Sequence, residues 1–316
     1  MVGKLAVVFP GQGSQVVGML ADAQSQVKTT FDEASSVLGY DLWELIQSGP
    51  EEKLNQTEFT QPALLAASIA LWRLLKERGM PEPSVVAGHS LGEYSALVAA
   101  NVIAFADAVS LVQKRGRYMQ NAVPIDMGGM AAVLGLDDQK VVDLCKQACE
   151  QAPGEAVVQA ANFNSPGQVV IAGESDILRR AMELCKEAGA KRVIPLSVSA
   201  PFHSALMQPA ADQMKDALSY VSFAPPEFRI IQNVDAAYCD DPEMIKENLI
   251  KQMFSAVLWT ATVQHFVASD IFHIVECGPG RVLSTLNRRI DRSITSSTIN
   301  SLESLESLDS FFGDFQ

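Results

Sequence analysis

The chain has 316 residues, of which 48% are hydrophobic and 19% charged, and this composition is typical of a globular protein with a large core. The formal net charge of −13 argues against binding to nucleic acid or to anionic membrane surfaces. No apolar run is long enough to cross a membrane, so the sequence predicts no membrane span.

The first segment, MVGKLAVVFPGQGSQ, is typical of a strand that runs into a glycine-rich loop. Its apolar run ends at Pro10, and it lacks the longer apolar region and the cleavage site of a signal peptide. We therefore expect a cytoplasmic protein. The five cysteines fit that compartment as buried thiols, and none of the four histidines forms a zinc-like cluster with them, so no metal is expected.

The first part of the chain alternates strand and helix patterns. An apolar strand over 4–9 is followed by a long helical pattern over 60–79, for which Thr60 is the expected N-cap. A second strand over 83–88 leads through a tight turn into another helix, and an amphipathic helix is expected over 104–123. This alternation predicts an α/β fold with a mainly parallel sheet.

The middle of the chain has a different order of elements, which indicates a separate unit. Strand and helix patterns follow one another as β-α-β-β-α-β, the ferredoxin-like arrangement. We expect these six elements over 130–136, 137–152, 156–163, 169–173, 174–189 and 191–199. Because a Gly128-Gly129 pair and a turn at 199–201 flank them, the sequence predicts a small subdomain of 128–198 inserted into the α/β domain.

Helix and strand patterns resume after the insertion, and the chain ends in an acidic segment. Strands are expected within 226–238 and over 271–277, and helices over 243–257 and 281–290. The α/β domain is therefore expected to comprise 1–127 and 199–292. The remaining residues, 293–316, are rich in serine and contain four acidic residues but no Lys or Arg, which predicts a C-terminal tail or a short docked helix.

The stretch VVAGHSLGEYSALVAA contains the pattern G-x-S-x-G at 88–92, in which a sharp turn exposes a serine. Here the pattern follows an apolar strand and opens a helix pattern, so we predict that Ser90 is a nucleophile. At the start of that helix, the backbone N–H of Leu91 and the helix dipole are placed to stabilise an oxyanion.

A serine hydroxyl is a weak nucleophile at neutral pH and needs a neighbouring base. His89 adjoins the serine, but neighbours on a tight turn point apart. His265 and His273 lie in apolar elements, where a histidine is more often structural. His203 stands in SVSAPFHSALM, in a loop after the insertion, and catalytic side chains collect in such loops, so it is the candidate base.

The group that orients the base is left open by the residues alone. Asp235, Asp240 and Asp241 come later in the chain, but none carries a signature. The second oxyanion donor must come from another loop, and FPGQGSQ, at 9–15, is the best candidate, although a simple glycine-rich turn is the alternative. Its glycine spacing does not match a dinucleotide-binding fingerprint.

Together these motifs resemble the malonyl-CoA:acyl-carrier-protein transacylases of fatty-acid synthesis and the related acyltransferase domains of polyketide synthases. The similarity covers almost the whole chain and includes FPGQGSQ, TQPALLA, GHSLGEYSAL, KRGRYMQNAVP, NFNSPGQVVIAG, PFHSALM, IKQM and GPGRVL. Each motif is short, but their joint order and spacing are specific. The resemblance implies an α/β-hydrolase-like core with an inserted ferredoxin-like subdomain, in agreement with the order of the predicted elements.

The resemblance also implies roles for individual residues. Ser90 matches the acylated nucleophile and His203 the base. The family holds that histidine with a backbone carbonyl, which here would belong to Gln252 in IKQM. Gln12 and Leu91 match the two backbone N–H donors of the oxyanion hole.

Two further residues bear on the substrate. Arg115, in KRGR, matches the arginine that pairs with the free carboxylate of malonate, although by itself it would be taken for a solvated charge at a helix end. Phe202, directly before the histidine, matches the bulky residue that accompanies malonyl selectivity in the polyketide domains. The resemblance therefore implies malonyl-CoA as substrate.

The implied reaction is a ping-pong transfer of malonyl from malonyl-CoA to the phosphopantetheine thiol of acyl carrier protein, through malonyl-Ser90. No cofactor is expected in the protein itself, and a monomer is expected. The carrier partners of the family are acidic, so docking on this acidic chain needs a local basic patch. Two alternatives stay open: a serine hydrolase that uses the same turn, and a carrier-binding module without activity.

Overall fold

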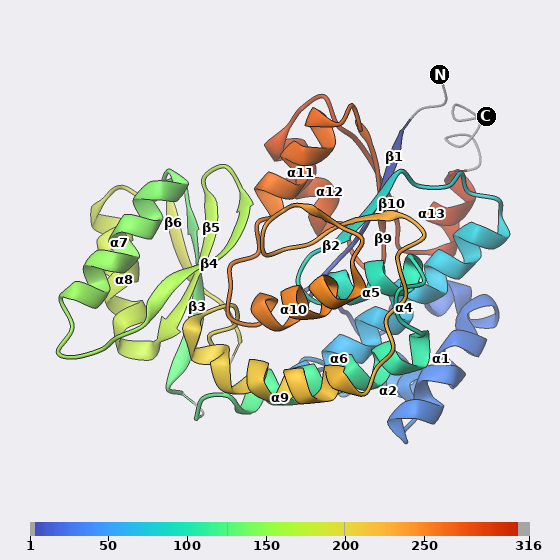
Figure 1. The fold of residues 1–316 in the computed structure, drawn as a ribbon, viewed down its shortest axis with the longest axis horizontal. Helices are drawn as coiled ribbons and strands as arrows, with labels where there is room; N and C mark the ends of the chain where they lie inside the picture. The colour runs from blue at the N-terminus through green and yellow to red at the C-terminus, as the bar shows by residue number, and fades with distance from the viewer. Residues whose placement is uncertain (1–3, 125, 199, 309–316) are drawn as a thin grey trace.

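The computed structural model describes residues 4–124, 126–198 and 200–308. Figure 1 shows a large sheet among most of the helices and a smaller sheet that carries α7 and α8 on its far side. The large sheet has the strand order β10-β9-β1-β2-β7-β8 and is parallel except for the pair β7–β8, as the predicted α/β fold requires. Its strands are β1 (Leu5–Phe9), β2 (Val85–Gly88), β7 (Arg229–Ile231), β8 (Tyr238–Cys239), β9 (His273–Cys277) and β10 (Thr295–Ile299).

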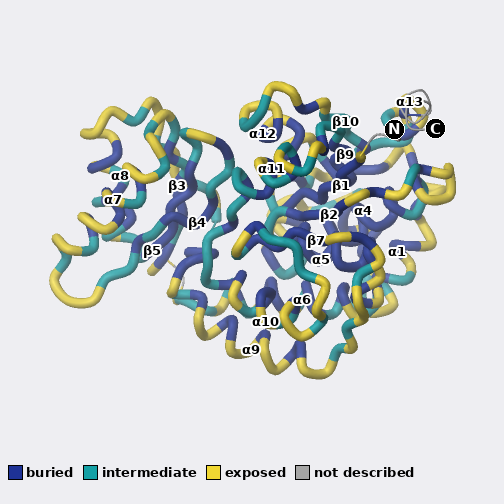
Figure 2. The backbone as a smooth tube through the Cα atoms, turned by 45° about the horizontal axis from the view of Figure 1, so that its top comes forward, coloured by how far each residue is buried: buried dark blue, intermediate teal, exposed yellow. Residues whose placement is uncertain are grey.

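The central strands are buried on both faces because helices cover the large sheet from both sides, as is usual for a parallel sheet (Figure 2). Along β1, Leu5, Val7 and Phe9 belong to one hydrophobic cluster, and the alternate residues Ala6 and Val8 belong to another. The sheet therefore stands between two cores, and this rigid support carries the loops at the carboxyl ends of its strands.

The helices around this sheet agree with the predicted patterns in type, but several were not predicted. Expected helices are present as α4 (Thr57–Glu77), α5 (Gly92–Ala99), α6 (Phe105–Asn121), α10 (Pro242–Gln252) and α12 (Val282–Ile290). Elements without a sequence prediction are α1 (Gln24–Leu38), α2 (Leu42–Ser48), α3 (Glu51–Leu54), α9 (Gln208–Ser219), the short η1 (Ala21–Ala23) and η2 (Ala205–Met207), and β8. His265 lies in α11 (Trp259–Ala268), as its apolar surroundings indicate.

The start of α4 corrects the sequence prediction. Thr60 is not the N-cap, because the helix begins at Thr57 with Gln56 as the capping residue. The backbone N–H groups of Phe59 and Thr60 already donate to the Gln56 carbonyl, and the Thr60 hydroxyl donates back to the Leu54 carbonyl. Threonine is a favourable N-cap residue, but the helix begins one turn earlier, at Thr57.

The small sheet has the strand order β4-β5-β3-β6 and is antiparallel throughout. Its elements are β3 (Gly128–Leu134), α7 (Asp138–Glu150), β4 (Val158–Ser165), β5 (Gln168–Glu174), α8 (Ser175–Glu187) and β6 (Arg192–Pro195). This order is the ferredoxin-like arrangement that the sequence predicts. Asp137 caps α7, with its carboxylate accepting from the backbone of Gln139 and Lys140.

The two sheets are joined by side-chain packing and by backbone hydrogen bonds. Alternate residues of β3 face opposite ways: Ala131 packs against α7 and α8, whereas Met130 belongs to the core of the large sheet. The Phe163 N–H donates to the Val257 carbonyl, and the Val257 N–H donates to the Ala161 carbonyl, both over 2.9 Å. The cleft between the sheets is therefore fixed at its base.

The described part of 293–316, expected to be a tail or a short docked helix, contains a strand that was not expected and a short helix that agrees with the second alternative. Thr295–Ile299 form β10, which extends the large sheet next to β9, and Leu302–Ser307 form the helix α13. A short serine-rich strand at a sheet edge needs only one neighbour, and its composition did not reveal it. Residues 309–316 lie outside the described part of the chain, and so does residue 199 at the expected subdomain boundary.

Candidate active site

The turn between β2 and α5 is as sharp as the G-x-S-x-G pattern predicts. Ser90 has a φ of +52°, in the left-handed region that residues other than glycine seldom adopt. A Cβ placed on Gly88 would overlap the backbone of Gly92, and one placed on Gly92 would overlap the Phe9 carbonyl oxygen. Both glycines are therefore required for the turn to close against β1.

Ser90 and His203 form a hydrogen-bonded pair. The Ser90 Oγ and His203 Nε2 atoms are 2.7 Å apart, and His203 Nδ1 is 2.8 Å from the Gln252 carbonyl oxygen. Because a carbonyl only accepts, Nδ1 carries the hydrogen and Nε2 is left as the acceptor for the serine hydroxyl. The tertiary structure thus brings together three of the predicted residues from β2–α5, from the loop before η2 and from the end of α10.

The other candidates whose contacts are described make different hydrogen bonds, although His89 lines the same cavity as Ser90. His89 Nε2 is 2.8 Å from Asn164 Oδ1, and His265 Nδ1 is 3.1 Å from the Ala236 carbonyl oxygen. Asp235 and Asp241 accept from nearby backbone N–H groups in exposed turns. The position that a carboxylate occupies in a triad is taken here by the carbonyl of Gln252.

Burial and, to a smaller extent, the neighbouring Arg115 charge lower the pKa of His203 to about 3, although the hydrogen bond to Gln252 opposes them. His203 is therefore neutral at physiological pH, as a proton acceptor must be.

We expect the rate of Ser90 acylation to stay constant as the pH falls from about 8 to about 6, although a free histidine would titrate there. In the unfolded chain His203 binds a proton below about pH 6.5, whereas in the folded chain it does not, so its contribution to stability declines as the pH falls below that value. Single-turnover acylation and thermal unfolding over this pH range test both points. An acylation rate that halves near pH 6.5 would contradict the expected constant rate.

Arg115 is buried, with a relative exposure of 1%, and points into the site from α6. Its NH1 donates to Gln61 Oε1 over 2.9 Å, and its NH2 donates to Gln252 Oε1 over 2.8 Å and to Ser90 Oγ over 3.1 Å. The alternative of a solvated helix-end charge is therefore wrong. A guanidinium beside Ser90 can bind an anionic group attached to that serine.

The remaining predicted residues line the same cavity. Gln12, Leu91 and Phe202 contribute to its wall, together with Ser90, Arg115 and His203, and its volume is about 640 Å³. Among the described residues, the backbone N–H groups of Gln12 and Leu91 donate to no other protein group. The His89 N–H donates to the Phe9 carbonyl, which holds the loop after β1 against the turn after β2. Both amides therefore lie in residues of the cavity wall and have no acceptor among the described residues.

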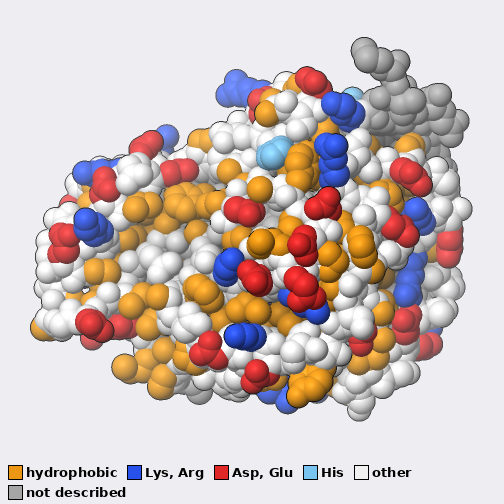
Figure 3. Space-filling view, viewed as in Figure 1, with side chains coloured by type: hydrophobic (Ala, Val, Ile, Leu, Met, Phe, Trp, Pro, Cys, Tyr) orange, Lys and Arg blue, Asp and Glu red, His pale blue; other side chains and the backbone are white. Residues whose placement is uncertain are grey.

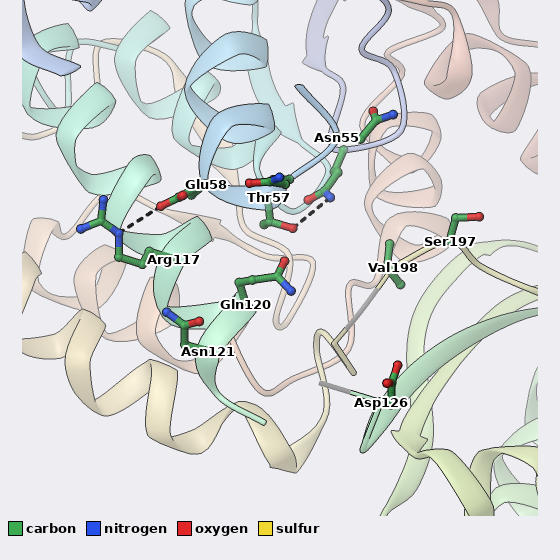
Figure 4. Close-up of a pocket in the computed structure, with 11 residues that line it drawn as sticks. Asn55, Thr57, Glu58, Arg117, Gln120, Asn121, Asp126, Ser197 and Val198 are labelled. Carbon is green, nitrogen blue, oxygen red and sulfur yellow. Dashed lines mark hydrogen bonds and ion pairs between the residues drawn. The ribbon is translucent and has the colours of Figure 1, made fainter. Parts of the chain in front are cut away.

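Figure 4 shows a second cavity, of about 500 Å³, next to the first. Gln12, Asn55, Ser197 and Val198 line both cavities, so the two form one continuous cleft between the large sheet and the small one. At the far end Arg117 pairs with Glu58, their Nε and Oε2 atoms being 3.1 Å apart. An extended ligand can therefore lie along the cleft.

Sequence reasoning missed three residues that hold the site. Asn233 follows β7, and its side chain accepts from the Ser90 N–H over 2.7 Å and donates to the Gly88 carbonyl over 2.6 Å. Gln61 binds Arg115, and Glu93 lies beneath the turn. Their only signals were polar residues within apolar patterns, in TQPALLA, GHSLGEYSAL and RIIQNV.

In the described ranges, no cluster of three or more His, Cys, Asp or Glu side chains could hold a metal ion. None of the helices in the described part of the chain has the length and apolar character needed to cross a membrane.

Comparisons with known proteins give the family. Residues 6–304 match the model of the acyl transferase domain. The chain is 51% identical to the malonyl CoA-acyl carrier protein transacylase of Escherichia coli K12 over 300 residues, with 94% of this chain and 96% of that protein covered. The transacylase of the same name from Bacillus subtilis is 43% identical over 302 residues, with 95% of this chain and 94% of that protein covered.

Solved structures agree in fold over the same length. An acyl carrier protein S-malonyltransferase from Vibrio cholerae superimposes with a TM-score of 0.94 at 52% identity, covering 97% of this chain and 100% of that one. A malonyl-transacylase in complex with a type II PKS acyl-carrier protein gives a TM-score of 0.94 at 49% identity, covering 96% and 98%. The chain therefore belongs to the acyl transferase domain family that includes the malonyl CoA-acyl carrier protein transacylases.

Proposed function

We propose that the protein transfers malonyl from malonyl-CoA to the phosphopantetheine thiol of acyl carrier protein and so supplies fatty-acid synthesis. The observation that carries this proposal is the buried Arg115, whose NH2 lies 3.1 Å from the nucleophile Ser90 Oγ. A guanidinium in that place favours an acyl group with a carboxylate, because an uncharged acyl group cannot accept its charge-assisted hydrogen bonds. The names of the relatives support the same assignment.

In the first half-reaction Ser90 attacks the thioester carbonyl of malonyl-CoA, and His203 takes the hydroxyl proton at Nε2. The negative charge that develops on the carbonyl oxygen is stabilised by the backbone N–H groups of Gln12 and Leu91. The bond to sulfur then breaks, His203 returns the proton to the leaving thiolate, and coenzyme A departs. Ser90 is left as the malonyl ester.

In the second half-reaction the thiol of the carrier protein replaces coenzyme A. His203 takes the thiol proton at Nε2, the sulfur attacks the ester carbonyl, and the same two amides stabilise the oxyanion. The Ser90 oxygen leaves and recovers the proton from His203. The thioester bond lost in the first step is formed again in the second, so no external energy source is needed.

The malonyl ester must react with a thiol faster than with water. Arg115 can bind the malonyl carboxylate through two parallel hydrogen bonds, which fixes the acyl group with its carbonyl at the oxyanion donors. Phe202, which is 7% exposed, limits the space beside the acyl group and so favours malonyl over branched groups.

Intact-mass measurement after mixing with malonyl-CoA tests the proposal against the serine-hydrolase alternative. We expect a stable malonyl adduct that disappears when carrier protein is added and reappears on the carrier. Rapid release of free malonate without carrier would instead support a hydrolase. Equal adducts from acetyl-CoA and methylmalonyl-CoA would contradict the malonyl assignment.

The proposal also covers the subdomains, the oligomeric state, the compartment and the cofactor requirement of the protein. The residues 1–127 and 199–292, extended by β10, would form the catalytic subdomain, and 128–198, whose Met130 and Leu196 line the cleft, would form the small one. The protein would act as a cytoplasmic monomer without a cofactor of its own, since the carrier brings the phosphopantetheine. Sedimentation tests whether the protein is a monomer, and the activity of metal-free protein tests whether it needs a cofactor of its own.

The docking site for an acidic carrier is expected in local cationic groups, because the chain as a whole is acidic. On the face shown in Figure 3, cationic and anionic side chains are interspersed. Two exposed sets of cations are candidates: Lys186, Lys191 and Arg192 on the small subdomain, and Arg281, Arg288, Arg289 and Arg292 around α12.

Reversing the charges of Arg281, Arg288 and Arg292 is expected to lower the association rate constant for the carrier about tenfold and to weaken its salt dependence. Stopped-flow binding at two salt concentrations measures both. Arg289 is left unchanged because it donates to Gln168 over 2.8 Å. Lys28→Glu, on the exposed face of α1, is the control, and an equal effect there would contradict a local docking patch.

A further inference from the structure

A buried carboxylate lies beneath the catalytic pair and takes no part in the steps described above. Glu93 is the second residue of α5 and has no exposed surface. Its Oε1 accepts from Gln232 Nε2, and its Oε2 accepts from the Asn233 backbone N–H and from Gln252 Nε2, each over 3.0 Å. All three partners are donors, so the surroundings suit an ionised carboxylate.

Gln252 connects the Glu93 carboxylate to Ser90, Arg115 and His203. Its side-chain Nε2 donates to Glu93 and to the Ser90 carbonyl, and its Oε1 accepts from Arg115 over 2.8 Å. Its backbone carbonyl accepts from His203. A flipped carboxamide would turn its NH₂ group toward the guanidinium and its oxygen toward the carboxylate, so Glu93 and Arg115 together allow one orientation.

The charges of Arg115 and Glu93 also compensate each other. Arg115 and Glu93 are both buried, and a single buried charge without a partner strongly destabilises a protein. Burial raises the pKa of Glu93, and the three donors and Arg115 oppose that effect. With Gln252 between them, the guanidinium and the carboxylate form a neutral set in the empty site.

We propose that Glu93 is the buried counter-ion of Arg115 and a positioning residue for acyl transfer, which acts through Gln252 and moderates the preference of the site for acyl groups that carry a carboxylate. The selectivity part rests on the proposed malonyl transfer, whereas the coupling of the two charges does not. When malonyl binds, Arg115 faces two carboxylates, its own counter-ion and that of the substrate. Glu93 thus limits how tightly the malonyl group is held and keeps its transfer rapid.

The consequence for selectivity has a definite direction. In Glu93→Gln the empty site carries one uncompensated positive charge, which a malonyl carboxylate neutralises and an acetyl group does not. We expect both acylation rates of Ser90 to fall because Gln252 loses its anchor, but the ratio of malonyl to acetyl rate to rise about tenfold. A merely structural loss would lower both rates alike and leave the ratio unchanged.

A double-mutant cycle with Glu93→Gln and Arg115→Met provides the test. Thermal unfolding of the four proteins is measured, together with single-turnover acylation by malonyl-CoA and by acetyl-CoA. Each single variant should unfold at a lower temperature than the wild type, and the double variant at a higher temperature than either single variant. Glu93→Asp keeps the charge and should leave the malonyl-to-acetyl ratio within about twofold of the wild type.

Glu276→Gln is the matched control. Glu276 is also a glutamate without exposed surface, but its carboxylate accepts from the backbone N–H groups of Leu283 and Ser284 at the start of α12. This variant should lower the unfolding temperature, combine additively with Arg115→Met, and leave the selectivity ratio unchanged.

Additive effects of Glu93→Gln and Arg115→Met on unfolding, or an unchanged malonyl-to-acetyl ratio in Glu93→Gln, would overturn the proposal. If Glu93→Gln does not fold but the double variant does, the coupling is supported. If Arg115→Met folds and neither protein with Glu93→Gln does, the counter-ion role is overturned. A wild type that forms no malonyl adduct refutes the proposed function, but the unfolding cycle still decides whether the two charges are coupled.

Discussion

Ser90→Ala is expected to remove the acyl-enzyme and to lower malonyl transfer on the order of 10⁴-fold or more. The Ser90 hydroxyl is the only one for which the structure records contacts with both His203 Nε2 and Arg115 NH2 among the described residues. Without that oxygen, His203 has no proton to accept and malonyl-CoA has no nucleophile to acylate. Intact mass after incubation with malonyl-CoA, and the rate of malonyl transfer to carrier protein, measure the loss.

Ser95→Ala is the matched control for this variant. Ser95 lies in the same helix, α5, is fully buried, and its hydroxyl has no hydrogen-bond partner among the described residues. Removing that hydroxyl should therefore leave the malonyl adduct and the transfer rate within about twofold of the wild type. A malonyl adduct that persists in Ser90→Ala would place the nucleophile elsewhere, and full activity would support a mechanism without an acyl-enzyme.

Arg115→Ala is expected to reverse the selectivity of the site. Malonyl-CoA would lose its carboxylate partner, and its rate of acylating Ser90 should fall about 10²- to 10³-fold, the usual effect of removing one member of a buried charge pair. Acetyl-CoA makes no such contact and should lose much less. Single-turnover acylation with each thioester gives the two rates under identical conditions.

Arg117→Ala controls for charge and for helix position. Arg117 lies two residues further along α6, is exposed, and pairs with Glu58 at the far end of the cleft. Its removal should change neither rate by more than about threefold, because exposed ion pairs contribute little. If Arg115→Ala lowered the malonyl and acetyl rates equally, the guanidinium would act on Ser90 itself and not on the acyl carboxylate.

The fold could be predicted in those segments where apolar residues recur at the spacing of a strand or of a helix. The βαββαβ order of the small sheet and the helix that follows Ser90 were predicted because apolar residues recur there at strand or helix spacing. The expected tail shows the limit. Thr295–Ile299 contain little apolar surface, and they form a strand because β9 offers a free edge, which no local pattern can reveal.

Some features of the site are set by the local sequence, whereas others depend on the tertiary structure. The elbow at Ser90 is local, because two glycines and one strand–helix transition within five residues define it. His203 was the candidate from its loop and was selected by the family resemblance, and the structure adds the 2.7 Å contact with Ser90 across 113 residues of sequence. Its partner could not be found from residue types at all, since every residue has a backbone carbonyl.

By itself the sequence determined the nucleophile, the two kinds of sheet and, through its motifs, the family resemblance. Only the tertiary structure decided that Arg115 is buried beside Ser90, that the Gln252 carbonyl holds His203, and that Glu93 lies beneath them. The physical reason is that a turn or an amphipathic period is set by neighbours in the chain. Burial, charge pairing and the choice of a carbonyl partner depend on segments that only packing brings together.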